Sequence, residues 1–258
     1  MTKARRKLRQ RNMARTAFGR SERMSPSRNL HDKIERAIGE RILSGEFMPG
    51  TVLPNEAEWG KVYGASRTAI REAIKSLTAK GLIQSRPKVG TRVEPRSRWN
   101  MLDRNVLEWH RSAMDRKAFL TSTQEARRLV EPGIAELAAR KHSPQQVERL
   151  VAAYHAMAEA TEPTSMVATD VEFHEALLAC ANNELLVPFS IIIEQALTNL
   201  FDYTTNKNPH YSRALKLHQN IVRAVVAADG PGAREAMLQL LADTDNVISA
   251  SPAMRKKR

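Results

Sequence analysis

Residues 64–77 read Gly-Ala-Ser-Arg-Thr-Ala-Ile-Arg-Glu-Ala-Ile-Lys-Ser-Leu, and this stretch decides the fold of the chain. At 3.6 residues per turn it predicts a helix with one apolar face. That face consists of Ala65, Ala69, Ile70, Ala73, Ile74 and Leu77. A second face carries Arg67, Arg71 and Lys75 at intervals of four residues, with Thr68 beside them. Ser66 stands where an N-cap oxygen accepts a free backbone N–H of the first turn.

Two interpretations of the basic face are open from the residues alone. One is an ordinary amphipathic helix whose cations face water. The other is a helix that binds duplex DNA, because Arg and Lys side chains contact guanine edges or phosphates and Ser or Thr can hydrogen-bond to either. The surrounding sequence favours the second interpretation.

The positive charge is confined to one end of the chain. The protein has 258 residues, enough for two domains with a sizeable core, and a net charge of +13. Residues 1–98 hold 23 Lys and Arg against 9 Asp and Glu, whereas residues 99–258 hold 18 against 19. Such an asymmetry is expected if only the N-terminal end meets a polyanion.

Several classes of protein are excluded by composition. No apolar run has the length of a transmembrane helix, and the basic N-terminus lacks the hydrophobic segment of a secretory signal. The single cysteine, Cys180, cannot form an internal disulfide, and its apolar neighbourhood predicts a buried structural thiol. We therefore expect a cytoplasmic protein.

The residues before and after the basic helix complete a winged helix-turn-helix pattern. Residues 1–28 carry ten Lys and Arg and one Glu, which predicts a disordered basic arm, with or without phosphate contacts of its own. A helix starts near Asn29, and a second begins after its N-cap Asn55 and ends at Gly64. The motif thus spans Asn55 to Ile74. Residues 82–86 and 89–93 predict two strands of a wing with a basic tip at Arg86 and Lys88.

With these motifs in place, the first hundred residues resemble the GntR family of bacterial repressors. The resemblance rests on residues 42–50 (Ile-Leu-Ser-Gly-Glu-Phe-Met-Pro-Gly), 53–54 (Leu-Pro), 66–73 (Ser-Arg-Thr-Ala-Ile-Arg-Glu-Ala), 81–83 (Gly-Leu-Ile) and 90–91 (Gly-Thr). It implies operator contacts by Arg67, Thr68 and Arg71 and by the wing around Lys88. With their neighbours, the predicted DNA-binding residues are Ser66, Arg67, Thr68, Arg71, Lys75, Arg86, Lys88 and Gly90. Ala57 stands where the family often has arginine, so one contact is in question.

Beyond a polar linker at residues 95–104 the pattern predicts successive helices only. They lie at residues 102–109, 119–141, 144–161, 166–181, 185–203, 212–229 and 232–249. About 150 residues of this kind are typical of an antiparallel helical bundle. The predicted fold is therefore mainly α, with an arm at 1–28, a winged helix-turn-helix domain at 29–97, and an all-helical domain for effector binding and dimerisation at 98–250.

Polar residues in the bundle suggest a binding site. Asp170 and His174 are four residues apart on one helix face, and His218 follows on a later helix. A carboxylate and two imidazoles can hold a divalent metal such as Zn or Ni, although an Asp/His pair alone is usually a surface hydrogen bond. Arg127 can bind a carboxylate bidentately, or form an ion pair with Glu131 on the next turn.

The second half is similar to the all-helical effector domain (FCD) of the FadR-type GntR subfamily. The similarity rests on Arg127 with Glu131 and Pro132, on Asp170 and His174 with Asn183 downstream, and on His218 with residues 228–236. It implies a metal held by one Asp and three His, and effector binding by Arg127, Asp170, His174, Asn183 and His218. The third His falls at Leu240, so two alternatives remain: a metal on Asp170, His174 and His218, or a metal-free polar cluster.

The linker resembles that of galactonate-type sugar-acid repressors, which implies a small carboxylate effector. We therefore expect a non-enzymatic transcription regulator, a repressor that an effector releases from a pseudopalindromic DNA operator, acting as a homodimer. One rival is a metal-dependent hydrolase-like enzyme using Asp170, His174 and His218, but no motif supplies its general base. The other is a nonspecific nucleic-acid-binding protein.

Overall fold

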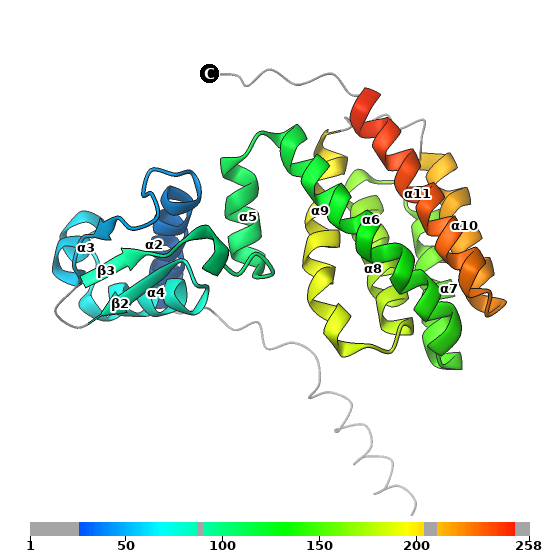
Figure 1. Cartoon of the computed structure of the whole chain (residues 1–258), viewed down its shortest axis with the longest axis horizontal. Coiled ribbons are helices and arrows are strands. Elements are labelled where there is room, and N and C mark those ends of the chain that lie inside the picture. Colours follow the sequence, from blue (N-terminus) through cyan, green and yellow to red (C-terminus); the bar gives the residue numbers. More distant parts are fainter. Residues whose placement is uncertain (1–25, 87–89, 204–210, 251–258) are drawn as a thin grey trace, which may run out of the picture.

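The computed structural model describes residues 26–86, 90–203 and 211–250. The predicted arm up to residue 25 and the wing-tip residue Lys88 lie outside the described residues. The described elements form a small N-terminal part and a larger helical part, and one helix, α5, stands between them (Figure 1). Within the described ranges no helix is both long and apolar enough to cross a membrane.

The N-terminal part consists of three helices and a small sheet. Its elements are α2 (Pro26–Leu43), β1 (Val52–Leu53), α3 (Glu56–Tyr63), α4 (Arg67–Ala79), β2 (Ile83–Arg86) and β3 (Gly90–Val93). Helix α2 begins at Pro26, inside the stretch predicted to be disordered, rather than at Asn29. Proline suits the first turn of a helix because its missing N–H would have no partner there.

Local capping fixes the turn between α3 and α4. The Asn55 side chain accepts from the backbone N–H groups of Ala57 and Glu58, and the Glu58 side chain accepts from the Asn55 N–H, which makes a capping box. Gly64 ends α3 in the left-handed conformation, with φ of 58°. Ser66 then caps α4 through the N–H of Ala69. The caps predicted at Asn55, Gly64 and Ser66 are all present, so the geometry of this turn is set by sequence-local contacts.

The wing is a three-stranded antiparallel sheet in the order β1-β3-β2. Strand β2 pairs with β3 from Ile83 opposite Val93 to Arg86 opposite Gly90. Strand β1 adds two residues to the other edge of β3, with Val52 opposite Arg92. The sequence predicted only the hairpin, because a two-residue strand is too short to show an alternating pattern.

Helix α5 (Arg104–Ala113) packs against the N-terminal part although it follows the predicted domain boundary at residue 98. Its Val106 and Trp109, together with Trp99 before it, belong to the same buried cluster as the apolar faces of α2 and α4. The side chain of Trp109 lies against buried Gly39 of α2. The apolar residues of this segment therefore extend the N-terminal core.

The contact between α2 and α5 predicts a stability effect at Gly39. A Cβ added at Gly39 would lie 2.4 Å from the Trp109 ring, so we expect Gly39→Ala to destabilise the protein by about 1–3 kcal/mol through overpacking. Gly133 in α6 (Arg116–Lys141) is the control because no heavy atom lies within 4 Å of its added Cβ. Gly133→Ala should be neutral or stabilising by up to ~1 kcal/mol. Urea unfolding monitored by circular dichroism measures both, and equal effects would contradict the proposed clash.

The C-terminal part is a bundle of antiparallel helices around its own core. Its elements are α6 (Arg116–Lys141), α7 (Pro144–Glu159), α8 (Pro163–Cys180), η2 (Glu184–Phe189), α9 (Ser190–Tyr203), α10 (Tyr211–Val226) and α11 (Gly230–Ala250). Helix α6 runs against α11, α8 and α9, and α10 packs on α11 (Figure 1). The start of the predicted helix at 185–203 is a 3₁₀ helix containing Pro188, because proline lacks the N–H that an α-helix requires.

Helix α9 of the bundle contacts α5. Arg104 forms an ion pair with Glu194, and Arg111 donates to the Asn199 side chain at 3.0 Å. Asn199 is buried. One side of α9 is therefore tied to the helix that packs on the N-terminal part, while Leu197 and Leu200 of α9 line the cavity described below.

Candidate DNA-binding surface and ligand cavity

Helix α4 presents a basic face to solvent. Arg67, Thr68, Arg71 and Lys75 are exposed, while Ala69, Ile70, Ala73, Ile74 and Leu77 are buried in the N-terminal core. The predicted amphipathic helix is confirmed. Because its apolar face is anchored in a rigid core, the cations are held in a row along the opposite side of the helix.

The cations of this face are only weakly neutralised. Lys75 lies 2.8 Å from Glu72 and Arg71 lies 4.0 Å from Glu56, and in both pairs the side chains are about half or more exposed. Exposed pairs of this kind contribute little free energy and exchange readily for other partners. Arg67 forms no ion pair with any other described residue. The face is therefore available to an external anion.

Strand β2 of the wing carries a further exposed cation. Arg86 is exposed at the end of β2, where its Nε donates to the Gln84 side chain at 2.9 Å. Gly90 opens β3 with φ of +92°, a conformation that L side chains rarely adopt. The structure thus gives Gly90 a backbone role in shaping the hairpin.

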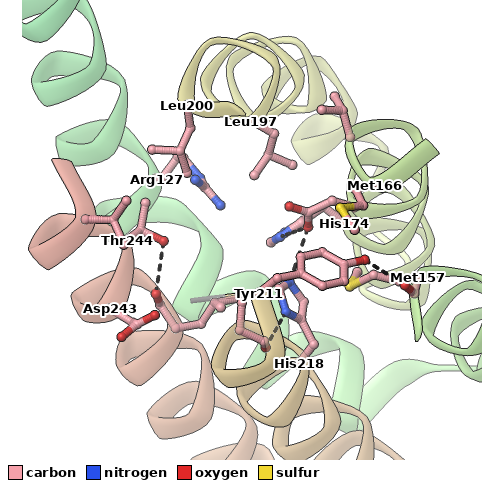
Figure 2. A pocket seen from close by; sticks show the side chains of 15 residues that line it. Arg127, Met157, Met166, His174, Leu197, Leu200, Tyr211, His218, Asp243 and Thr244 are labelled. Atoms are coloured by element: carbon pink, nitrogen blue, oxygen red, sulfur yellow. Dashed lines mark hydrogen bonds and ion pairs between the residues drawn. The ribbon is translucent and has the colours of Figure 1, made fainter. Parts of the chain in front are cut away.

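The helical bundle encloses a cavity (Figure 2). The cavity volume is about 70 Å³, several times the roughly 10–15 Å³ that one water needs. Its polar lining consists of Arg127, Asp170, His174, Tyr211, His218, Asp243 and Thr244. Its apolar lining includes Met157, Met166, Val167, Leu197, Leu200, Leu240 and Val247. An apolar chamber with a few converging polar groups is the usual form of a small-molecule site.

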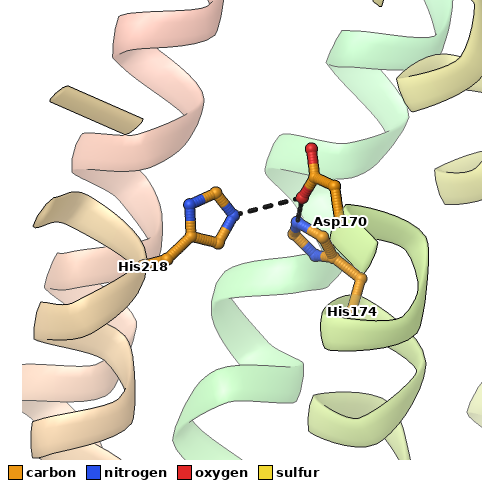
Figure 3. Close-up of side chains that lie close together, drawn as sticks. All are labelled: Asp170, His174 and His218. Atoms are coloured by element: carbon orange, nitrogen blue, oxygen red, sulfur yellow. Dashed lines mark ion pairs between the residues drawn. The ribbon is translucent and has the colours of Figure 1, made fainter. Parts of the chain in front are cut away.

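The predicted Asp/His/His cluster forms one wall of this cavity. Asp170 and His174 project from α8, and His218 projects from α10 (Figure 3). Asp170 Oδ1 lies 3.5 Å from His174 Nε2 and 3.3 Å from His218 Nε2. One ligand atom from each residue lies within 4.8 Å of the others. Burial acts to raise the pKa of Asp170, but the nearby imidazoles of His218 and His174 outweigh burial and lower that pKa.

The orientation of the two imidazoles favours a bound cation. His218 Nδ1 lies 2.7 Å from the Ala214 carbonyl and His174 Nδ1 lies 3.0 Å from a Glu131 carboxylate oxygen, so both Nδ1 atoms carry the proton. The Nε2 atoms of both rings then point toward Asp170 Oδ1, where each either carries a proton and pairs with the carboxylate or offers a lone pair to a cation. These three atoms are buried without a hydrogen-bond partner among the described residues. One carboxylate oxygen and two imidazole nitrogens that face one another in this way fit a divalent cation, and the partners of the Nδ1 atoms are those typical of metal-ligating histidines.

Arg127 faces the cavity and is also paired with Glu131. The guanidinium Nε lies 2.5 Å from Glu131 Oε1, and Nη1 lies 3.4 Å from the Gln124 side chain. The ion pair considered from the sequence is thus present. Burial acts to raise the pKa of Glu131, but the charge of Arg127 and the contacts with His174 and Arg127 lower it to about 2. The carboxylate is therefore ionised at neutral pH.

The structure separates Asn183 from the other predicted effector-binding residues. Its side chain caps η2 by accepting from the Leu185 N–H at 3.1 Å, and it does not line the cavity. The resemblance to the FCD domain implied effector binding by Asn183, but this residue lies beyond the end of α8, at the start of η2. Leu240, at the position of the expected third histidine, does line the cavity.

Sequence reasoning missed Asp243 and Tyr211, which also line the cavity. Asp243 Oδ1 lies 2.8 Å from Arg213 Nε, and the Tyr211 hydroxyl donates to the Met157 carbonyl at 2.6 Å. Burial and the nearby charge of Asp170 raise the pKa of Tyr211 to about 12. Asp243 lies one helical turn after Leu240, so the helical period could have pointed to it once Leu240 was placed at the site.

Comparison with known families matches both parts of the chain. Residues 30–93 match the family model described as bacterial regulatory proteins of the gntR family. Residues 123–243 match the model described as the FCD domain. The chain is 33% identical over 228 residues to the uncharacterised HTH-type transcriptional regulator YieP of Escherichia coli K12. The aligned residues make up 87% of this chain and 98% of YieP.

Further relatives agree with these matches. The galactonate operon transcriptional repressor of Escherichia coli K12 is 32% identical over 218 residues, which cover 84% of this chain and 95% of the repressor. The solved structure of Lar, which controls the expression of the Listeria monocytogenes agr system, shares the fold, with a TM-score of 0.55 at 17% identity over 85% of this chain and 96% of Lar. These proteins are transcription regulators, not enzymes, and this chain belongs to the GntR family of bacterial regulators, with a winged helix-turn-helix followed by an FCD domain.

Proposed function

We propose that this GntR-family regulator is a repressor whose hold on its operator is released by a small carboxylate bound in the helical bundle. The observation that carries the proposal is the presence, in one chain, of an exposed basic face on α4 and of a cavity lined by Arg127, Asp170, His174 and His218. A surface for DNA and a chamber for a ligand are the two sites that such a regulator requires.

The proposed DNA contacts come from α4 and the wing. Arg67, Thr68 and Arg71 would contact base edges, with Lys75 and the wing residues Arg86 and Lys88 on phosphates. Ser66 and Gly90 would shape the helix start and the hairpin that carry these contacts. Ala57 is exposed on α3, so the arginine contact that the family often makes there would be missing from this operator complex.

The proposed assembly is a homodimer on a pseudopalindromic operator in the cytoplasm, where the chromosome is located. Two winged domains related by a dyad would place their α4 helices in successive major grooves. We propose residues 29–97 as the DNA-binding domain and 98–250 as the domain for effector binding and dimerisation. Helix α5 falls in the second range although it packs on the first, and it would connect the two through α9.

A divalent cation would bind at Asp170, His174 and His218. Three buried atoms of these residues lack a hydrogen-bond partner among the described residues, which supports this assignment. Two imidazole nitrogens with one carboxylate oxygen suit Zn²⁺ or Ni²⁺. The ion would supply a positive charge with open positions for a carboxylate ligand. Leu240 offers no ligand atom, so the protein would contribute three ligands.

The proposed effector is a small acid of the sugar-acid type. The galactonate operon repressor is among the relatives of this chain, which supports that class of ligand. Asp243 and Thr244 also line the cavity on α11, at a distance from the labelled histidine His174 (Figure 2). A carboxylate accepts hydrogen bonds from ligand hydroxyl groups, so Asp243 would select a hydroxylated acid.

Two measurements test the proposed function. Purified protein and genomic fragments are first screened for a preferred DNA site, and a salt-sensitive affinity without any preferred site would show nonspecific binding instead. The preferred fragment is then titrated with protein in the presence of galactonate and related acids, with and without added Zn²⁺ or Ni²⁺. An acid that changes operator affinity about 5- to 150-fold supports an allosteric repressor, and equal affinities throughout would refute the coupling.

Replacement of His218 should separate operator binding from the response to the acid. We expect His218→Ala to bind the operator normally and to lose most of its response to the acid, because α10 is remote from α4 but His218 lines the cavity. Asn183→Ala is the matched control, since Asn183 only caps η2 and its loss costs about 0.5–2 kcal/mol of local stability. Gel shifts with and without the acid measure both variants. If His218→Ala still responds fully to the acid, the cluster of Asp170, His174 and His218 is not part of the effector site.

A further inference from the structure

Glu131 is the most completely buried carboxylate near the cavity and has two partners. Its side chain is 2% exposed, and it lies on α6 one turn after Arg127. One oxygen, Oε1, lies 2.5 Å from Arg127 Nε. The other, Oε2, lies 3.0 Å from His174 Nδ1. The carboxylate thus connects a buried cation on its own helix to an imidazole on α8.

The contact with His174 determines which nitrogen of that ring is free. An ionised carboxylate only accepts hydrogen bonds, so His174 Nδ1 must donate, which leaves Nε2, on the side of Asp170 and His218, as the nitrogen that can bind a cation. Without an acceptor at Nδ1 the ring could carry its proton on Nε2, where it would donate to Asp170 and could not bind a cation. Among the described residues Glu131 performs this task for His174, whereas the Ala214 backbone carbonyl performs it for His218.

We propose that Glu131 is a positioning residue that sets the tautomer and orientation of His174 for cation binding, and that Arg127 serves mainly to keep Glu131 in place. The proposal rests on the proposed function, in which Asp170, His174 and His218 hold a divalent cation. Glu131 itself does not line the cavity and would touch neither cation nor effector. Carboxylates that orient ligating histidines typically change metal affinity 10- to 100-fold when they are removed.

The geometry also changes the role expected of Arg127. Its Nε and Nη2 are directed at Glu131, at 2.5 and 3.5 Å, and its Nη1 is directed at Gln124. The fork that would bind an effector carboxylate bidentately is therefore largely occupied by Glu131. Arg127 would contribute its charge to the cavity, while the cation on the histidine cluster binds the effector carboxylate.

The test compares the metal-free and Zn²⁺-loaded full-length protein in three variants. Glu131→Gln keeps an oxygen acceptor for His174. The double variant Arg127→Met, Glu131→Leu removes both charges of the pair together, so that no unpaired charge is left buried and the protein can fold. Glu136→Gln, which changes a partly exposed ion pair on the same helix, is the matched control. Circular dichroism verifies that each variant is folded.

Two readouts decide the outcome. Nitrogen chemical shifts of the histidine rings in the metal-free protein report the tautomers, and competition with a chromophoric chelator reports Zn²⁺ affinity. We expect the double variant to lose the Nδ1-protonated form of His174 but not of His218, and to bind Zn²⁺ about 10- to 100-fold more weakly. Glu131→Gln should lose less Zn²⁺ affinity, and Glu136→Gln should match the wild type.

Unchanged His174 shifts in the folded double variant would overturn the proposal. Failure of the wild type to bind Zn²⁺ or Ni²⁺, with the His174 shifts changed as expected, would instead refute the cation site of the proposed function.

Discussion

The variant Arg67→Ala, Arg71→Ala is expected to lose sequence-specific operator binding. Each arginine that reads a base edge contributes about 1–3 kcal/mol. The two together should weaken binding roughly 30-fold to 10⁴-fold if their effects are independent. Both side chains are exposed on α4, and neither is held by a strong ion pair, since Arg71 lies 4.0 Å from Glu56. The loss of binding should therefore occur without loss of stability.

The measurement is a footprint and a gel-shift titration at two salt concentrations. Arg149→Ala, Arg223→Ala is the control, because it removes the same charge from exposed positions on α7 and α10 of the bundle. We expect the control to bind like the wild type. The double α4 variant should keep weak, salt-sensitive binding through the wing and lose its preference for the operator. An unchanged footprint would show that α4 does not read the DNA.

Replacement of Arg127 by methionine is expected to destabilise the folded protein by about 3–5 kcal/mol at neutral pH. The substitution removes the main partner of a buried carboxylate, because Arg127 and Glu131 are both 2% exposed at the side chain. An ion pair broken on one side leaves a buried charge uncompensated, which costs this much free energy. Arg128→Met, on the next residue, is the control. Its ion pair with Asp245 is about half exposed on the arginine side, and such pairs contribute at most about 1 kcal/mol.

The pH dependence gives this prediction a second check. In the wild type the pKa of Glu131 is lowered from its ordinary 4.5 to about 2. The carboxylate therefore contributes stability above pH 4.5, roughly 3 kcal/mol, and this contribution is lost as the pH falls toward 2. Without Arg127 the buried Glu131 carboxyl prefers its neutral form. Lowering the pH should therefore reduce the destabilisation of the variant. Urea unfolding at pH 7 and pH 4 should show a smaller difference between variant and wild type at pH 4. An equal difference at both values would contradict a charge effect.

Local patterns in the sequence determined the DNA-binding half. The spacing of Ile70, Ile74 and Leu77 requires a helix with one buried face, and the caps at Asn55, Gly64 and Ser66 fix the turn before it. These features depend on contacts within four residues of one another, so periodicity and cap chemistry are sufficient to predict them. The basic face follows because whatever lies opposite a buried face is exposed.

The candidate cluster was predicted in part. Asp170 and His174 share a helix face, so the sequence brings them together, but the approach of His218 depends on the packing of α10 and α8 around α7 and on no local rule. The positions of Asn183 and Asp243 relative to the cavity also could not be predicted from local rules. Asn183 is three residues from Cys180 at the end of α8 and lies outside the cavity, whereas Asp243 is remote in sequence and lines it.

The sequence by itself determined the elements of this protein, the winged helix-turn-helix order, the exposed cations of α4 and the membership of the second half in an all-helical class. Only the tertiary structure decided that α5 packs on the first core, that Glu131 stands between Arg127 and His174, and that a cavity lies beside the histidines. The physical reason is range. Hydrogen bonds of helices and caps join neighbours along the chain, whereas burial and cavity shape depend on which distant helices pack together.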